Sequence, residues 1–178
     1  MTLWSERIFG VVALTLVVCM LPIGQAQAWD QADLDKLKMT NTCYRCDLTS
    51  ADLSGADLTG STLVGADLTG ANLTHANLAG ANLGGARLIV ANLAGANLAG
   101  ADLIGSYLID AILGGADLSE ANISGASLYG ANLIGANLAG ANLTNANLTY
   151  ADLRFADLTG ANLTGADRSG ADMSGAKR

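Results

Sequence analysis

The chain has 178 residues and a formal net charge of −7, and only 4% of its residues are aromatic. This acidic balance argues against binding of nucleic acid or of an anionic membrane through the overall field of the protein. His75 is the only histidine, so the sequence lacks the further ligands of a typical zinc site, and nothing in it suggests a Ser-His-Asp triad. We therefore expect a protein that is not an enzyme and that binds no cofactor or metal.

Residues 1–28 have the composition of an export signal. Arg7 precedes an almost wholly apolar run over residues 8–23, and Ala26-Gln27-Ala28 forms a small-x-small motif. A basic start, an apolar centre and a small-residue motif are typical of secretory signals, and the run is shorter than the ~20 residues that span a bilayer. The sequence therefore predicts cleavage after Ala28 and an exported protein that keeps no membrane attachment.

Residues 29–40 (WDQADLDKLKMT) are the only later stretch with a helical pattern. Asp30 suits an N-cap, and Lys38 lies near the C-terminal end, where cations are favourable. Leu34 and Leu37 are spaced to share one face of the helix. Because repeat proteins must close their open ends, we expect this helix to cap the region that follows.

A five-residue pattern fills residues 41–175. In the unit 66–70 (ADLTG), alanine lies two residues before a central leucine, aspartate one residue before it and glycine two residues after it. The centre is leucine, or isoleucine at Ile123, at every fifth position from Leu48 to Leu163, which makes 24 consecutive units. Self-similarity at a fixed short period predicts a solenoid in which each coil stacks on its neighbours.

A period of five residues fits neither a helix nor a strand, because neither would place every fifth residue on one face. A chain that turns a corner once per unit fits the pattern: leucine and alanine point inward, Asp and Asn point outward, and glycine takes the turn position that needs a positive φ. Val90, Tyr150 and Phe155 replace this glycine. Because such side chains resist positive φ, we expect their corners to change turn type and keep φ negative.

The units from Cys46 to Gly175 resemble the pentapeptide repeat family, whose consensus is A(D/N)LXX. The resemblance implies an all-β solenoid, namely a right-handed quadrilateral β-helix with four units per coil, followed here by a short tail at residues 176–178. The whole chain is similar to exported members of the family from the cyanobacterial thylakoid lumen. The resemblance therefore implies the thylakoid lumen, and the expected export signal by itself also allows the periplasm.

A pair of cysteines precedes the first good unit. In the register of the units, Cys43 takes a leucine position and Cys46 an alanine position, so both should face the interior. Exported proteins meet oxidising conditions, and we expect a disulfide between them. Inert buried thiols, a redox-active pair and a zinc site are the alternatives, but Arg45 alone is a weak cause for a lowered thiol pKa and His75 lies far along the repeats.

One side of a 20-residue coil collects apolar and aromatic residues in its outward positions. An exposed patch of this kind usually marks a contact surface, although outward positions also tolerate single apolar residues without a function. A 15-residue coil would instead align Ile89, Ile104 and Ile134, so the clustering alone does not fix the number of sides. The candidate partner surface consists of Ile89, Val90, Tyr107, Ile109, Tyr129 and Tyr150.

These features predict a non-catalytic interaction or scaffold protein of the exported compartment. We expect it to be a monomer or weak dimer that binds an unidentified protein partner and no nucleic acid. The family resemblance implies an alternative, because some cytosolic members mimic the acidic DNA rod and bind DNA gyrase. Asp57, Asp117 and Asp157 do share one side, but neutral asparagines lie between them, and an exported protein does not meet gyrase.

Overall fold

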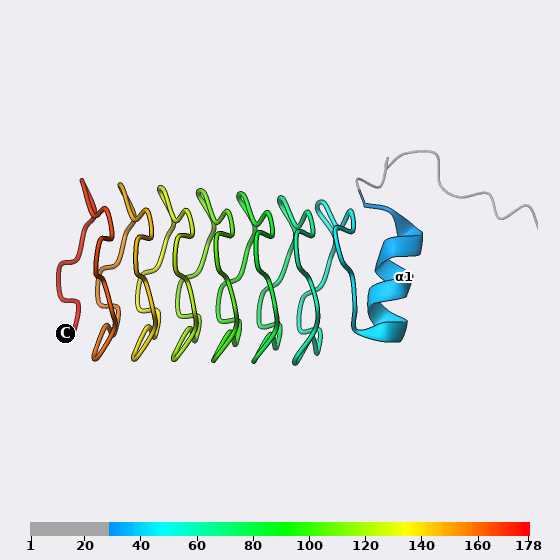
Figure 1. Cartoon of the computed structure of the whole chain (residues 1–178), viewed down its shortest axis with the longest axis horizontal. Helices are drawn as coiled ribbons and strands as arrows, with labels where there is room; N and C mark the ends of the chain where they lie inside the picture. Colours follow the sequence, from blue (N-terminus) through cyan, green and yellow to red (C-terminus); the bar gives the residue numbers. More distant parts are fainter. Residues whose placement is uncertain (1–28) are drawn as a thin grey trace, which may run out of the picture.

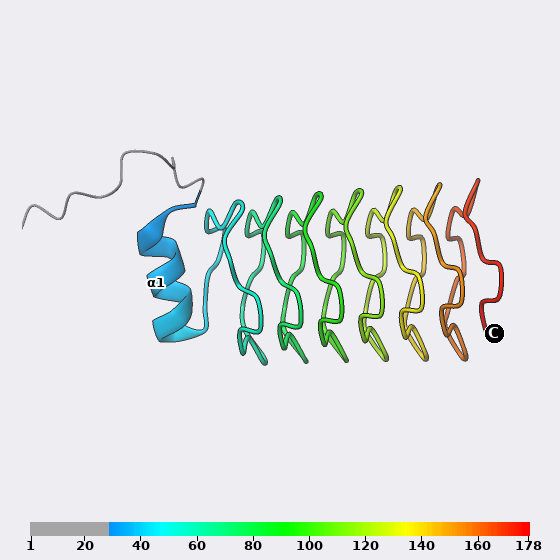
Figure 2. The same cartoon turned by 180° about the vertical axis from the view of Figure 1, so that it is seen from behind.

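One helix, α1 (Gln31–Thr40), closes one end of a stack of coils that runs to the C-terminus (Figure 1, and from behind in Figure 2). The computed structural model describes residues 29–178, so the expected export signal lies outside the described residues. Asp30 is the N-cap and accepts a hydrogen bond from the N–H of Ala32 at 2.8 Å. Leu34 and Leu37 are buried against the first coil. Among the described residues, no helix is long and apolar enough to cross a membrane.

Each coil of the stack contains 20 residues. Parallel bridges join residues that are twenty apart, from the pair Thr42–Thr62 to the pair Asp157–Lys177. The chain turns once per unit, and in each turn the alanine N–H donates to the carbonyl of the preceding leucine, as Ala71 does to Leu68 at 3.0 Å. Four turns per coil give the coil four sides, which rules out the 15-residue alternative.

The bridges are isolated pairs and do not form extended strands. The reason is that each side is short, because a corner follows every fifth residue. On each side, only the outward residue before the leucine forms bridges to the coils before and after it. This differs from the long strands of most all-β proteins. The stack is held together by many short parallel pairings.

The core is a column of inward-facing leucines and alanines that follows the axis of the stack. Leu98 is completely buried, and Leu78 and Leu118, one coil away on either side, are at most 1% exposed. Their backbones are tied to the neighbouring coils as well: the N–H of Leu98 donates to the carbonyl of Asp117 at 2.6 Å, and the N–H of Leu78 donates to that of Asn97 at 2.6 Å. Each coil is therefore sealed by the next one.

Every corner residue, meaning the fifth residue of a unit, has a positive φ, including those that are not glycine. Val90 has φ 51°, Tyr150 φ 61° and Phe155 φ 60°, so the expectation that these corners would keep φ negative is wrong. The hydrogen bonds explain it. The N–H of Val90 donates to the carbonyl of Ile109 at 2.9 Å and that of Tyr150 to Ser169 at 2.9 Å, and another turn type would break these bonds between coils.

The two ends of the stack differ. Arg168, which stands in a leucine position of the last coil, is exposed, and Leu163 and Met173 beside it are only partly buried. Pairing continues beyond the expected tail boundary at residue 175, because the N–H of Lys177 donates to the carbonyl of Ala156 at 2.9 Å. The N-terminal end is covered by α1, whereas the last coil has no coil or helix of the described chain over it (Figure 1).

Candidate functional site

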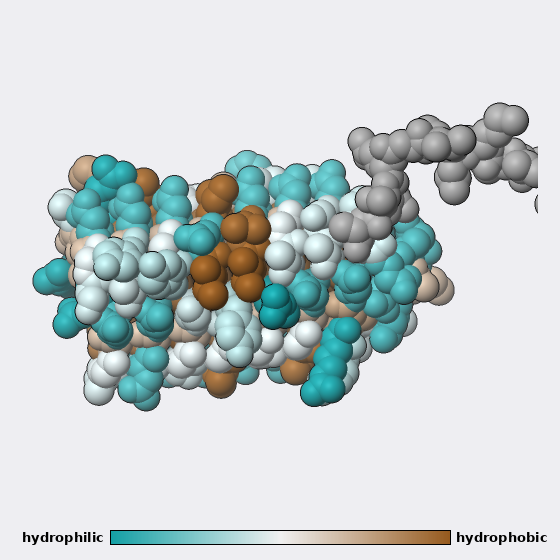
Figure 3. Space-filling model, turned by 90° about the horizontal axis from the view of Figure 1, so that it is seen from above, coloured by the Kyte–Doolittle hydropathy of each residue, from teal (hydrophilic) through white to brown (hydrophobic). Residues whose placement is uncertain are grey.

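The candidate partner surface lies on one side of the stack, which we call the apolar side. This side is made of the seven units 46–50, 66–70, 86–90, 106–110, 126–130, 146–150 and 166–170. Its apolar side chains gather midway along the rod, where they form the brown group in Figure 3. Val90, Tyr107, Tyr129 and Tyr150 are between 41% and 64% exposed. Ile89 and Ile109 are half-buried between them.

Direct contacts order this surface. The rings of Tyr129 and Tyr150 meet edge to face with their centroids 5.6 Å apart, an arrangement that aromatic pairs favour. Because the N–H of Val90 donates to the carbonyl of Ile109, and the N–H of Asp110 to that of Tyr129, both at 2.9 Å, the residues of successive coils stack in files. The surface is therefore fixed by the backbone ladder rather than by flexible loops.

Charged groups lie around the apolar residues. Arg87 pairs with Asp67 of the preceding coil, with Nε 3.2 Å from the carboxylate, and both side chains remain partly exposed. The carboxylate of Asp110, at a corner inside the surface, has no ion-pair partner among the described residues. A partner that covers this side would meet an apolar area with an unneutralised carboxylate within it.

Val90 and Tyr150 occupy backbone conformations that cost free energy. For residues with a side chain, the left-handed conformation costs roughly 1–2 kcal/mol relative to the usual regions, and β-branched and bulky residues are its rarest occupants. Glycine, which adopts it readily, stands at most other corners. Two of the three large apolar corner residues therefore lie on the apolar side and carry strain that glycine would remove.

Corner side chains also lean over the next coil. A Cβ added at Gly170 would lie 2.5 Å from Tyr150 Cδ1, and one at Gly175 would lie 2.6 Å from Phe155 Cδ1. A Cβ at Gly95 would meet His75 in the same way, at 2.6 Å from Nδ1. Tyr150, Phe155 and His75 therefore each lie over a glycine twenty residues later, whereas Val90 is followed at that spacing by Asp110.

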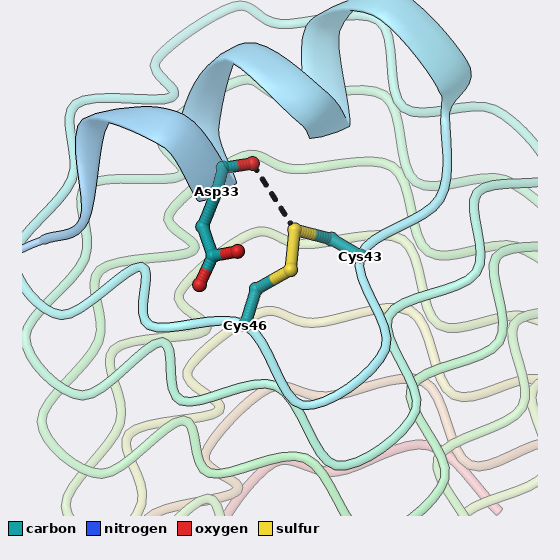
Figure 4. Close-up of side chains that lie close together, drawn as sticks. All are labelled: Asp33, Cys43 and Cys46. Atoms are coloured by element: carbon teal, nitrogen blue, oxygen red, sulfur yellow. Dashed lines mark hydrogen bonds between the residues drawn. A yellow bond between two sulfur atoms is a disulfide. The ribbon is translucent and has the colours of Figure 1, made fainter.

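A second candidate site joins α1 to the first coil. Cys43 and Cys46 are bonded as a disulfide and are buried, and Cys43 Sγ lies 3.2 Å from the carbonyl oxygen of Asp33 (Figure 4). A disulfide sulfur carries no proton, so this is a packing contact. The carboxylate of Asp33 accepts a hydrogen bond from the N–H of Asp47 at 2.8 Å. Although Asp33 and both sulfurs lie close enough to hold a metal ion, bonded sulfurs offer it no thiolate.

The outward aspartates and asparagines already have structural partners. In the recurring pattern, the side-chain oxygen accepts the N–H two residues later, as Asp157 does from Thr159 at 2.9 Å. The hydroxyl and N–H of Thr159, together with the ammonium of Lys177, lower the pKa of Asp157 to about 2. These carboxylates are therefore held in turns at the surface.

The repeats also identify the relatives of the chain. A model of pentapeptide repeats matches it in eight copies, over residues 51–88, 86–125, 126–165 and 141–177. The chain belongs to the pentapeptide repeat family. A search of curated proteins found no match.

Solved structures of the family include one with a similar overall shape. A pentapeptide repeat protein (Rfr23) from the cyanobacterium Cyanothece 51142 is 30% identical, with a TM-score of 0.53 over 82% of this chain and 97% of that one. A pentapeptide repeat protein from the Arabidopsis thaliana thylakoid lumen is 36% identical over 65% of this chain and 63% of that one, with a TM-score of 0.40. HetL from Nostoc, which is involved in heterocyst differentiation regulation, is 37% identical over 72% and 70%, with a TM-score of 0.36.

Sequence reasoning placed the six residues of the candidate surface on one side, and the 20-residue coil brings them there. It missed Ile112, which lies just beyond the Asp110 corner and is 43% exposed. It also missed the strain at Val90 and Tyr150. The sequence does carry a signal for the strain, since both residues replace glycine in the repeat, but the preferences of these residues predict a change of turn type instead.

Proposed function

We propose that this pentapeptide repeat protein is a non-catalytic interaction protein of an exported compartment, the thylakoid lumen or the periplasm. It binds a protein partner through the apolar side of a right-handed, four-sided β-helix. The pattern of an export signal in residues 1–28 and the similarity to a thylakoid-lumen protein support this exported location. The absence of a cofactor or a catalytic role is part of the same proposal.

The strain at Val90 and Tyr150 is the observation that carries the proposal. Backbone strain of this kind is concentrated at functional sites, because glycine would otherwise replace a residue that costs stability. Both side chains are more than half exposed, so burial in the protein's own core does not compensate for the strain. A partner that covers these side chains would supply a compensating interaction, since aromatic anchors carry much of the binding energy of interfaces.

The test compares partner capture by folded variants. Val90→Gly with Tyr150→Gly removes two side chains and relieves two strained corners. It also loses the contact between the rings of Tyr129 and Tyr150 and makes the unfolded chain more flexible, so the variant should be about as stable as the wild type. In a pull-down from a lumenal or periplasmic extract, it should nevertheless lose a partner that the wild type captures. His75→Gly is the matched control, because it makes the same change at an exposed corner with φ 56° on a different corner of the coil. Equal capture by all three proteins would refute the assignment of the apolar side.

The DNA-mimic alternative has weaker support in the charges of the rod. Lys177 neutralises Asp157, with Nζ 2.9 Å from the carboxylate, and Asn137 lies between Asp117 and Asp157 in the same file. A DNA mimic would need a continuous file of charge, since the acidic phosphates dominate how proteins bind DNA. Cell fractionation separates the two functions, because a cytosolic location would favour the mimic and contradict the proposal above.

A further inference from the structure

α1 covers only part of the edge of the first coil. On two sides of this coil, residues 41–45 and 46–50, the residue before the leucine position is bonded to the helix and its flanks. The N–H of Asp47 donates to the carboxylate of Asp33 at 2.8 Å, and the carbonyl of Asp47 accepts from the N–H of Asp30 at 3.1 Å. The N–H of Thr42 donates to the hydroxyl of Thr40 at 3.3 Å. These bonds replace those that a preceding coil would make.

The other two sides keep an open backbone edge. Among the bonds of the described residues, the N–H groups of Asp52 and Asp57 donate to nothing, and the carbonyls of Asp52, Ser54 and Asp57 accept nothing. One coil later, the equivalent groups are paired: the N–H of Asn72 donates to Ala51 at 2.9 Å. Unpaired edges of this kind are templates on which another extended chain can pair.

A hollow lies beside this open edge. It has a volume of about 450 Å³, a size that is usual for ligand sites, and it lies between the helix and the first coil. Its apolar lining includes Leu37, Leu53, Ala56 and Leu58, and Ala56 is only partly buried. The open edge therefore has backbone donors and acceptors next to a space for apolar side chains.

We propose that this edge binds a peptide segment of a partner protein, which adds two further sides to the first coil in parallel register. The next coil gives the pattern of such a segment. Between the first two coils, the N–H of Leu53 donates to the carbonyl of Asn72 at 2.8 Å, and the N–H of Gly55 donates to that of Thr74 at 2.9 Å. If the peptide takes the place of a preceding coil, its third residue corresponds to Leu53, so the N–H of that residue donates to the carbonyl of Asp52. The fifth residue then donates to the carbonyl of Ser54.

The same template limits the length and the sequence of the peptide. The carbonyl of the first peptide residue accepts a hydrogen bond from the N–H of Asp52. After the corner, the carbonyl of the sixth peptide residue accepts one from the N–H of Asp57. The carbonyl of Thr59 is already taken by the side-chain amide of Asn41 at 2.9 Å, so pairing ends after the eighth residue. The segment that fits is Ala-x-Leu-x-Gly-Ala-x-Leu, with small residues beside the corners, leucines in the hollow and glycine at the turn of positive φ. This mode of recognition takes affinity from the backbone and specificity from alternate side chains.

The experiment uses a synthetic peptide, Ala-Ser-Leu-Ser-Gly-Ala-Ser-Leu, titrated into the purified, isotope-labelled protein. We expect saturable shifts of the backbone amide signals of Asp52, Ser54 and Asp57. A peptide N-methylated at its third residue loses one donor and should bind about tenfold more weakly, since one hydrogen bond typically corresponds to that factor. A peptide with aspartate at both leucine positions should not bind.

Two protein variants complete the test. Ala56→Phe fills the hollow and should abolish binding, whereas Ala161→Phe, a partly buried alanine of the last coil, should leave binding unchanged. Saturable binding that is lost in Ala56→Phe and weakened by N-methylation supports the proposal. The proposal is overturned by the absence of saturable binding at millimolar peptide, by equal affinity of the N-methylated peptide, or by shifts that map to the last coil instead. None of these outcomes depends on the apolar side.

Discussion

Replacing Gly170 by alanine tests whether a corner side chain requires glycine twenty residues later. Gly170 has φ 70°, and a Cβ there would lie 2.5 Å from Tyr150 Cδ1. Gly160, with φ 71°, is the control, because the only atom near its added Cβ is the backbone nitrogen of Gly140 at an ordinary 3.9 Å. The two glycines are only ten residues apart near the C-terminal end, so fraying affects both.

The expected magnitudes follow from these contacts. At Gly160, alanine suffers only the left-handed conformation, roughly 1–2 kcal/mol, offset by about 0.4–1 kcal/mol through the lower entropy of the unfolded chain. The net loss is about 1 kcal/mol. At Gly170 the ring of Tyr150 must also move away from Tyr129, and losing such an aromatic pair costs about 0.5–1.5 kcal/mol more. We therefore expect Gly170→Ala to cost about 2 kcal/mol.

Thermal unfolding followed by circular dichroism measures the difference. For a protein of this size, about 1 kcal/mol lowers Tm by about 2–4 °C, so Gly160→Ala should lower it by about 3 °C and Gly170→Ala by about 6 °C. In the double variant Tyr150→Gly with Gly170→Ala, the extra loss should disappear, which makes a double-mutant cycle with a coupling energy of about 1 kcal/mol. If both alanine variants have the same Tm, the ring of Tyr150 does not rest on Gly170.

Three further predictions concern the core, the cysteines and pH. Leu98→Ala should lower the free energy of unfolding by about 2–5 kcal/mol through lost burial and a cavity, and Leu98→Lys should cost more because it buries an unpaired charge; denaturant unfolding that finds the lysine variant as stable as wild type would contradict the inward column. Thiol labelling of the folded protein should find neither Cys43 nor Cys46 free until a reductant is added, and removing their short disulfide should cost about 2 kcal/mol on the chain-entropy estimate. The pKa of Asp157 is about 2 when folded and about 3.9 when unfolded, so its stabilising contribution is complete above about pH 4 and is lost as the pH falls towards 2. Lys177→Ala should raise this pKa in an NMR titration, and an unchanged value would show that the ion pair contributes nothing.

Much of the fold could be predicted because the repeat specifies it many times. The inward positions of Leu98 and the other leucines, the outward positions of the aspartates and the turn at each glycine all follow from one five-residue rule. The number of sides did not follow from that rule, because corners can close a coil of either three or four units. Only the bridges between residues twenty apart decide this point.

The candidate sites show where local rules fail. Preferences of single residues predicted a negative φ at Val90, yet the ladder bonds on both sides of the corner hold it at 51°, because many cooperating bonds outweigh one unfavourable residue. The sequence also could not predict that α1 covers only part of the first coil. The sequence indicates a cap through Leu34 and Leu37, but which half of the coil it closes depends on how the helix crosses the end.

Because a coil has four units, each unit makes a quarter turn around the axis of the rod. The side on which a unit lies therefore depends on how many units precede it, whereas the packing of the leucine core does not. Inserting or deleting one unit between Ile109 and Tyr129 would keep every leucine inward and every ladder bond available. It would nevertheless rotate all later residues to a neighbouring side and separate Tyr129 and Tyr150 from Ile89. A rod that serves only as a spacer can change length by five residues at a time. A rod that binds a partner through one side can change length only by whole coils of 20 residues, which is the sequence separation of bridged residues such as Arg87 and Tyr107.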